Sequence, residues 1–241
     1  MGIEFITNQE KVLSEVIKNI LPSTKNWNVL VGYFYFSGFQ EIYGSLKGKH
    51  VKILVGMNAG VDGKNKIQEF ISLGKNEQTR GEQREEYYRS LVSIISETGD
   101  FDTLEKQEAF RLFLEKINDG TLEIKKTVQP THAKLYIFEN EASHTQGGSF
   151  PGTIITGSSN LTYSGLKKNY EINVISRDRA DYEESLRIFN ELWASSILLA
   201  DKATVEEFMR GVVDKIFIDK LPTPYELYIN CLLYTSPSPR D

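Results

Sequence analysis

The sequence has few of the features that would place it in a membrane or in a secreted disulfide scaffold. Its one cysteine, Cys231, excludes a disulfide within the chain. No run of about 18 apolar residues occurs, so no transmembrane helix is expected. Residues 1–12 lack the basic and then apolar pattern of a signal peptide. These absences predict a cytoplasmic protein without membrane contact.

Positive charge is also scarce. The net charge of the 241 residues is −5, so the chain lacks the overall basic character of a tight, non-specific nucleic-acid binder. A nucleic-acid partner would need a local basic patch or a second domain. Hydrophobic residues make up 40% and charged residues 25%, which is ordinary for a globular protein. A chain of this size can bury a core, and we expect one domain over residues 1–220.

Strand-like and helix-like segments alternate in a way that predicts an α/β fold. Residues 27–36 form a strongly β-prone run, residues 39–46 a short helix and residues 49–55 the next strand. This order is typical of a βαβ unit.

A helical insert is expected next, over about residues 64–118. It rests on two amphipathic patterns, at 87–98 and 103–118. Residues 122–128 then predict an edge-type strand with alternating lysines. A long amphipathic helix is expected over residues 178–195.

Residues that carry chemistry lie on two strand-like segments. His132 and Lys134 are two apart on an apolar segment, so their side chains are expected to project from one face. Asn169 and Glu171 have the same spacing on a later segment and are expected to project together. If the two segments are neighbours, these polar groups meet.

A turn lies between those segments in the sequence. The apolar run 153–156 leads into Gly157-Ser158-Ser159-Asn160. Backbone N–H groups and serine hydroxyls at such a turn suit a bound phosphate. An imidazole, an ammonium, a carboxamide and hydroxyls that converge on one point would form a phosphodiester site, and none of them needs a metal or a cofactor.

These residues resemble the signature of the phospholipase D superfamily: His-x-Lys, an acidic residue after four intervening positions, and Gly-Ser-x-Asn. The acidic position is Glu139, where aspartate is usual in the family, and Gly157 opens the Gly-Ser-Ser-Asn turn. Glu171 follows the motif asparagine by eleven residues, as in nuclease-like members. Lys134 and Gly157 are separated by 22 residues, more than the family norm, and residues 140–152 read as an inserted surface loop.

The resemblance implies a mixed β-sheet flanked by helices on both faces, a phospholipase D-like α-β-α sandwich. It also implies a metal-independent phosphodiesterase in which His132 attacks phosphorus and forms a phosphohistidine. Lys134, Asn160 and a serine of the turn would hold the non-bridging oxygens. Glu171 is expected to hydrogen-bond the imidazole and orient it. Because the chain has one copy of the motif, a homodimer is expected to supply the second histidine.

Two further segments resemble a subgroup of the superfamily in which the phospholipase D-like domain precedes a superfamily-two, Swi/Snf-like helicase. They are VGYFYFSGF at 31–39 and LPTPYELYI at 221–229. DNA is therefore the expected substrate, and an ATP-driven helicase domain is the expected neighbour in a longer chain. Residues 221–230 would be a linker or the start of that motor. Residues 231–241, CLLYTSPSPRD, are expected to be a non-native read-through tail.

Two other functions remain open at this point. One is a catalytically inactive DNA-binding or dimerisation module of a helicase, which the acidic balance and Glu139 permit. The other is a lipid phosphodiesterase, although no amphipathic membrane-facing stretch supports it. Single residues also have plain alternatives: Asn160 could be only a helix cap, Ser158 and Ser159 could only stabilise the turn, and Glu171 could pair with a surface lysine.

Overall fold

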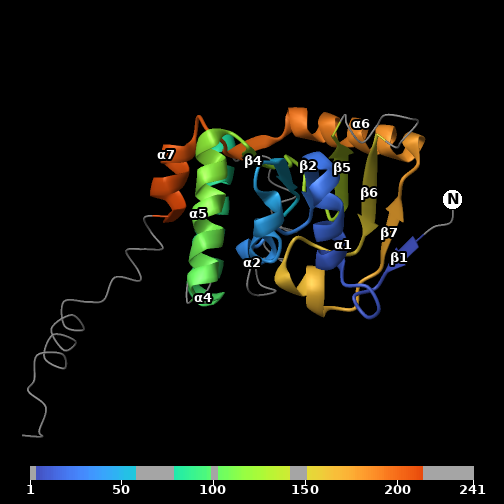
Figure 1. The fold of residues 1–241 in the computed structure, drawn as a ribbon. Helices are drawn as coiled ribbons and strands as arrows, with labels where there is room; N and C mark the ends of the chain where they lie inside the picture. The colour runs from blue at the N-terminus through green and yellow to red at the C-terminus, as the bar shows by residue number, and fades with distance from the viewer. Residues whose placement is uncertain (1–3, 58–78, 99–102, 142–150, 214–241) are drawn as a thin grey trace, which may run out of the picture.

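The computed structural model describes residues 4–57, 79–98, 103–141 and 151–213. In these residues one mixed sheet has eight strands in the order β1-β7-β6-β5-β2-β3-β4-β8 (Figure 1). The strands are β1 (Glu4–Ile6), β2 (Thr24–Val31), β3 (His50–Val55), β4 (Leu122–Lys126), β5 (Leu135–Asn140), β6 (Gly152–Gly157), β7 (Asn173–Ser176) and β8 (Ile197–Ala200). The predicted α/β class is confirmed.

Strand direction brings the motif segments to one end of the sheet. β2, β3 and β4 run parallel, and the chain passes from β2 to β3 through α2 (Phe36–Gln40) and η2 (Tyr43–Leu46), so the predicted βαβ unit is present. β5 is antiparallel to β2, and its first residue, Leu135, lies opposite Leu30 near the end of β2. Leu135 also pairs with Thr156 near the end of β6. The end of β2, the start of β5 and the end of β6 are therefore neighbours.

The β-prone run 27–36 leaves the sheet earlier than predicted. β2 ends at Val31, and Phe36 already begins α2. The ring centroids of Phe36 and Phe39 lie 5.6 and 5.1 Å from that of Phe113, in the larger core. Burial of these rings against a helix of the insert outweighs their β-propensity, which depends strongly on context.

β4 is an interior strand, so the edge position predicted for residues 122–128 is wrong. It pairs with β3 on one side and with β8 on the other, and β8 was not predicted. The Lys125 ammonium lies 4.7 Å from the centroid of the Trp193 ring and donates to the Trp193 carbonyl at 3.2 Å. A cation that lies over an aromatic face in this way is tolerated on an interior strand.

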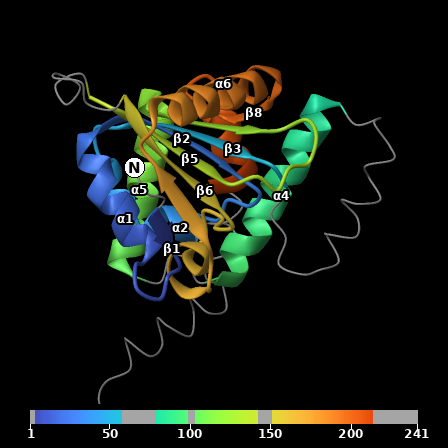
Figure 2. The same ribbon diagram turned by 90° about the vertical axis from the view of Figure 1, so that its right-hand side faces the viewer.

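The two faces of the sheet carry unequal layers. The helix α6 (Arg179–Ser195) covers one face, over a smaller core that includes Tyr182, Phe189 and Trp193 (Figure 2). The larger core lies on the other face, under the remaining described helices. These include α2 and η2, given above, and α1 (Leu13–Ile20), α4 (Arg80–Thr98), α5 (Leu104–Asp119) and α7 (Val205–Phe208). The short turns η1 (Leu21–Ser23), η4 (Ser164–Lys168) and η5 (Met209–Val213) complete the described helical elements. Helices on both faces confirm the expected sandwich.

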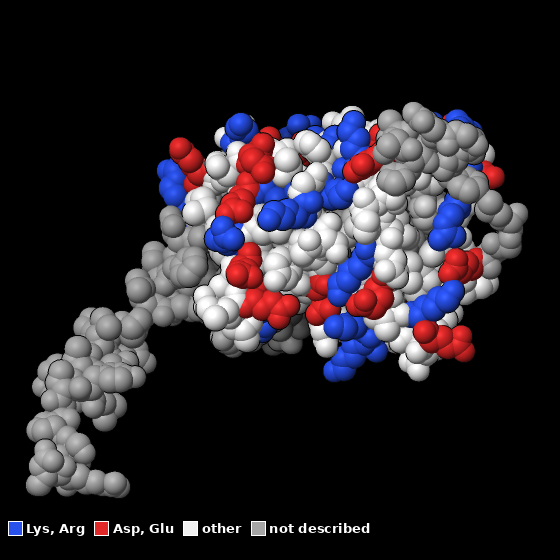
Figure 3. Space-filling model, viewed as in Figure 1, with Lys and Arg blue, Asp and Glu red and all other residues white. Residues whose placement is uncertain are grey.

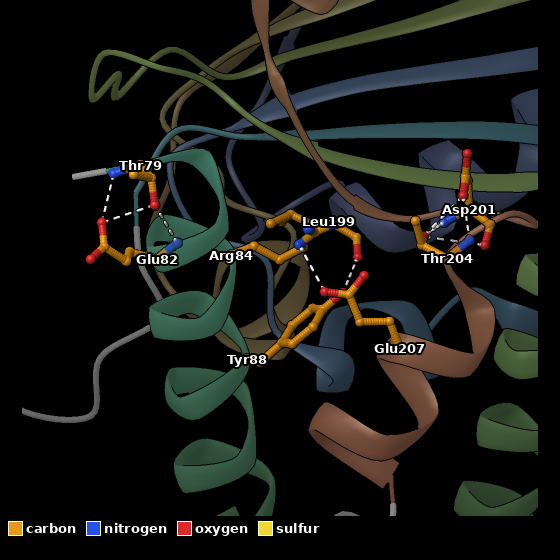
Figure 4. Close-up of polar contacts among 8 residues, drawn as sticks. All are labelled: Thr79, Glu82, Arg84, Tyr88, Leu199, Asp201, Thr204 and Glu207. Carbon is orange, nitrogen blue, oxygen red and sulfur yellow. Dashed lines mark hydrogen bonds and ion pairs between the residues drawn. The ribbon is translucent and has the colours of Figure 1, made fainter.

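The insert helix α4 begins earlier than the predicted start at residue 87. Thr79 and Glu82 form a capping box at its first turn (Figure 4). The Thr79 N–H donates to the Glu82 carboxylate at 2.7 Å, and the Glu82 N–H donates to the Thr79 hydroxyl at 3.3 Å. These bonds satisfy backbone donors that have no partner within the helix, so the charged run before residue 87 becomes helical.

Two polar contacts fasten α4 to the C-terminal elements (Figure 4). The Tyr88 hydroxyl donates to the carbonyl of Leu199 in β8. The Arg84 guanidinium Nε lies 3.1 Å from the Glu207 carboxylate in α7. The insert is therefore part of the same packed body as the end of the sheet.

Several predicted segments lie outside the described residues. They are residues 64–78 of the insert, residues 142–150 of the inserted loop, and all of the predicted linker and tail at 221–241. Within the parts that are described, none of the helices is both long and apolar enough to cross a membrane.

Candidate active site

His132 and Asn160 meet above the glycine that follows β2. A Cβ atom built on Gly32 would lie 3.2 Å from Asn160 Oδ1 and 3.6 Å from His132 Nδ1. A larger residue here would crowd both groups, so the small size of Gly32 permits their approach. The imidazole and the carboxamide, which are 28 residues apart in the sequence, therefore share one place in the fold.

The backbone beyond β2 orients the Asn160 carboxamide. The Tyr33 N–H donates to Asn160 Oδ1 at 2.9 Å. The Tyr35 N–H donates to the carbonyl of Leu161 at 3.1 Å, so this segment runs alongside the turn. With its oxygen occupied, the carboxamide offers its Nδ2 hydrogens as donors. The sequence predicted a β-prone run over residues 27–36 and gave no sign of this contact with the motif asparagine.

His132 lies just before β5 rather than on it. Its side chain is exposed, and its ring meets the Tyr33 ring edge-on, at 5.9 Å between centroids and 78° between planes. Lys134 also precedes β5, and its carbonyl accepts from the Thr156 hydroxyl at 2.9 Å. This bond ties the His-x-Lys segment to the end of β6.

The Lys134 ammonium is half-buried and electrostatically coupled to Glu171. Burial lowers the pKa of Lys134, while the nearby Glu171 carboxylate raises it. The two charges therefore interact, although no ion pair joins these two described side chains. A partly desolvated cation acts more strongly on a bound anion than one in bulk water.

Glu171 is held by Ser158, not by the imidazole. The Ser158 hydroxyl donates to Glu171 Oε2 and accepts from the Ile172 N–H at 3.0 Å. Although both residues are described, no hydrogen bond joins Glu171 to His132, so the predicted orienting contact is absent from this structure. The plain alternative was a pair with Lys167 or Lys168. Lys167 pairs with Glu41 at 3.0 Å, and no ion pair joins Lys168 to Glu171 among the described residues.

Ser159 stabilises the turn from inside the protein. Its side chain is fully buried, and its hydroxyl accepts from Asn173 Nδ2 at 2.9 Å. Its carbonyl accepts from the Tyr136 hydroxyl at 2.9 Å. Burial raises the pKa of Tyr136, so this hydroxyl stays protonated as a donor. The Ser159 hydroxyl is therefore committed to the turn, as in the plain alternative of a turn-stabilising serine, and a contact between Ser159 and the substrate stays a prediction.

Asn8 and Asn173 also position the site, and sequence reasoning missed both. Asn173 accepts from the Ser159 N–H at 3.3 Å in addition to donating to its hydroxyl. Asn8 Nδ2 donates to the carbonyls of Gly165 and Asn169, each at 3.0 Å. A polar amide in the apolar strand β7 was the available signal for Asn173. Nothing local marks Asn8, which acts across 157 residues of sequence.

The structure also places three other residues of the sequence prediction: Gly157, Asn169 and Glu139. A Cβ atom on Gly157 would lie 2.2 Å from the Ile172 carbonyl, so only glycine permits this close approach. Asn169 lies four residues before β7 and not on it, so it does not share a strand face with Glu171. Glu139 lies near the far end of β5 and accepts from Asn26 Nδ2 at 2.8 Å. It is five residues from Lys134, roughly 17 Å along an extended chain, and does not reach the site.

The side chains of the site include hydrogen-bond donors and a positive charge, which together suit a bound anion. The Asn160 carboxamide and the Lys134 ammonium supply donors and positive charge, and the His132 imidazole is a nucleophile or an acid–base group. Among the described residues, no cluster of three or more His, Cys, Asp or Glu side chains is arranged to hold a metal ion.

We expect Glu171→Gln to move the alkaline limit of activity to lower pH. Cationic Lys134 is the form that neutralises phosphate charge, so activity should fall as pH rises through the pKa of Lys134. Burial already lowers this pKa, and loss of the Glu171 charge removes the opposing effect. Rate–pH profiles between about pH 7 and 10 measure the shift. Glu183→Gln on the exposed face of α6 is a matched control, and an unchanged alkaline limit in Glu171→Gln would contradict this coupling.

Comparisons with known proteins find one matching family and several similar solved structures. The sequence model of a family described as "Cardiolipin synthase, PLD-like domain" matches residues 17–193. No curated protein matches the chain. Similar solved structures include a phospholipase D family member, Nuc, from Salmonella typhimurium, with a TM-score of 0.45, 14% identity and coverage of 82% of this chain and 97% of that chain. NucT from Helicobacter pylori has a TM-score of 0.44, 10% identity and coverage of 82% and 98%.

A polyphosphate kinase from Porphyromonas gingivalis is also similar, with a TM-score of 0.42, 13% identity and coverage of 80% of this chain and 26% of that chain. The family match spans well over half of the 241 residues and includes His132, Lys134, Asn160 and Glu171. The chain therefore belongs to the phospholipase D-like family described as "Cardiolipin synthase, PLD-like domain".

Proposed function

We propose that this protein is a metal-independent phosphodiesterase that cleaves DNA through a phosphohistidine at His132. The observation that carries the proposal is the meeting of His132 and Asn160 above Gly32, with His132 Nδ1 and Asn160 Oδ1 both within 3.6 Å of the space a Cβ would fill. Membership of the phospholipase D-like family supports phosphodiester chemistry at these residues. Lys134, with its desolvated ammonium, completes the half-site.

The proposed reaction has two displacements. An imidazole nitrogen of His132 attacks phosphorus, the P–O bond to the leaving group breaks, and a second histidine protonates the leaving oxygen. Water then attacks the phosphohistidine, the P–N bond breaks, and the second histidine takes the proton from water. Lys134 and Asn160 Nδ2 hold the non-bridging oxygens, on which negative charge must be stabilised.

The second histidine is proposed to come from a second copy of the chain. Exposed apolar side chains beside the half-site support a homodimer. Tyr170 is 66% exposed and Ile172 is 51% exposed, on either side of Glu171, and Phe5 on the neighbouring strand β1 is 59% exposed. A surface that carries such exposed apolar side chains suits association with a second molecule. A two-fold axis that buries it would bring two half-sites together.

DNA is proposed as the substrate because local features near the site suit a nucleic acid. Lys167 and Lys168 are exposed at the end of η4, and exposed Tyr163 and Tyr170 flank this turn. Exposed aromatic rings stack on bases, and lysines attract phosphates. On the face drawn in Figure 3, basic and acidic side chains of the described residues are interspersed without an extended basic patch. A helicase domain in the same full-length chain would supply further DNA contacts, as the resemblance of residues 31–39 suggests.

A subunit-mixing experiment tests the shared centre. We expect an equal mixture of wild-type and His132→Ala chains, exchanged by co-refolding, to retain about one quarter of the cleavage activity on a DNA oligonucleotide in chelator. Only wild-type dimers have both histidines, and they make up the square of the wild-type fraction. Half of the activity would instead indicate that each chain acts alone.

Mixing with Glu183→Gln, a surface change on α6, controls for losses during exchange and should leave activity undiminished. A strict monomer with full activity in light scattering would contradict the dimer. Loss of cleavage in chelator would contradict the metal-independent chemistry. DNA binding without cleavage of any phosphodiester would favour the alternative of a non-catalytic helicase module.

A lipid phosphodiester is the second candidate substrate. The matched family is described as "Cardiolipin synthase, PLD-like domain". Exposed Phe5, Tyr170 and Ile172 could equally contact acyl chains. Hydrolysis of phospholipid in vesicles, measured beside DNA cleavage with the same preparation, decides between the two substrates.

A further inference from the structure

A polar cavity lies between α6 and the sheet, at the end of β2 that is remote from His132. Its volume is about 390 Å³, which is within the range of small-molecule sites. Asn26 and Asn28 of β2 line it, whereas Gly32 at the other end of the same strand lies under His132. Six residues of extended chain, roughly 20 Å, separate Asn26 from Gly32, so the cavity is distinct from the half-site.

The register of the strands determines which side chains form the floor of the cavity. Side chains at matched positions on neighbouring strands form rows across a sheet, about 4.8 Å apart. The floor of this cavity has two such rows, both polar: Glu139–Asn26–His50 and Asn28–Lys52–Glu123. Leu186 and Asn190 of α6 line the opposite wall. The cavity is therefore bounded by a polar face of the sheet on one side and by a helix on the other, and we call it the slot.

Asn28 is the residue that points to a ligand. Its side chain is 7% exposed, and it lies between buried Trp27 and Val29 in the central strand β2. Among the described residues, none hydrogen-bonds its carboxamide, although that carboxamide lines the cavity. The carboxamide has two donor hydrogens and an acceptor oxygen. A bound molecule that presents both an acceptor and a donor can therefore pair with it inside the cavity.

The neighbouring groups define the charge of that molecule. The Lys52 ammonium is 4.0 Å from the Glu123 carboxylate and lies 5.3 Å from the centroid of the Trp193 ring, so its charge is balanced. Glu139 accepts one hydrogen bond, from Asn26, and has no cation within ion-pairing distance among the described residues. The slot therefore disfavours a phosphate and favours hydroxyl groups, which donate to a carboxylate.

We propose that this slot binds an uncharged nucleoside as a second, non-catalytic site. The Asn28 carboxamide donates to and accepts from the edge of the base, the pairing that asparagine makes with adenine. Glu139 accepts from ribose hydroxyls, and the exposed His50 ring stacks on the base. The three residues span neighbouring strands β2, β3 and β5, so one flat molecule reaches all of them.

Calorimetric titration of the full chain with adenosine, guanosine, cytidine and uridine tests the proposal. We expect at least one nucleoside to bind, adenosine most tightly, and its 5′-monophosphate to bind more weakly. Asn28→Leu should weaken binding at least tenfold. Its unfolding temperature without nucleoside should be equal or higher, because leucine replaces an unpaired polar group. Glu139→Gln should reduce the preference for the ribonucleoside over the 2′,3′-dideoxynucleoside.

His132→Ala is the matched variant at the other end of β2, and it should bind the nucleoside as the wild type does. This result separates the slot from the catalytic half-site, so the outcome does not depend on the proposed nuclease activity. Three results would overturn the proposal: no nucleoside binding at millimolar concentration, unchanged affinity in a folded Asn28→Leu protein, or tighter binding of a monosaccharide or a mononucleotide than of every nucleoside.

Discussion

His132→Ala is expected to lower the rate of phosphodiester cleavage by about 10⁴-fold or more, since removal of a nucleophile eliminates the covalent route. His132 is exposed and lies beside Asn160 above Gly32, so the substitution removes the proposed nucleophile without opening a hole in the core. Single-turnover cleavage of an end-labelled DNA oligonucleotide in chelator measures the loss. Rapid quenching in alkali should trap a labelled phosphohistidine in the wild type and none in the variant.

The chain offers a matched control for this change. His144→Ala alters a histidine that is not part of the motif, and it should cleave at the wild-type rate. Circular dichroism and thermal unfolding should be the same for His132→Ala and the wild type. If folded His132→Ala protein still cleaves DNA, the proposed mechanism is contradicted.

Asn160→Ala is expected to lower kcat by about 10² to 10³-fold, the usual effect of removing one donor that stabilises developing negative charge. The Tyr33 N–H holds Asn160 Oδ1 at 2.9 Å, so Nδ2 is the group left to donate to phosphate. Alanine removes both this donor and the acceptor for Tyr33, and it should also reduce stability by about 1–3 kcal/mol. Steady-state kinetics and urea unfolding separate the two effects.

Asn160→Asp distinguishes a catalytic role of the Asn160 carboxamide from a structural role. Aspartate keeps an oxygen that accepts from the Tyr33 N–H, so the unfolding free energy should stay close to that of the wild type. It also replaces the donor with a negative charge beside the phosphate, so kcat should fall at least as far as in Asn160→Ala. If Asn160→Asp restores activity, the carboxamide is only a cap for the segment after β2, which was the plain alternative for this residue.

The chain segments of the half-site were predictable because their signals are local. Alternation of polar and apolar residues predicted strands around His132 and after the Gly-Ser-Ser-Asn turn, and the order of strand, helix and strand predicted the βαβ unit. Antiparallel pairing of β5 with β2 and β6 then brought these segments together. The same patterns misplaced element ends. Because β5 begins at Leu135 and β7 at Asn173, the side chains of His132, Lys134 and Glu171 lie on the connections just outside the strands. That position leaves their side chains free of the sheet.

The sequence by itself determined the fold class, the family and the set of polar groups available for chemistry, because these depend on residue type and on spacing along the chain. Only the tertiary structure decided which of those groups face a substrate. Ser158 and Ser159 are adjacent, yet one is exposed beside Glu171 and the other is buried against Asn173. Likewise Lys125 lies on an interior strand and Asn28 lines a cavity, because strands distant in sequence cover them. Burial is set by such long-range neighbours, which no local period encodes.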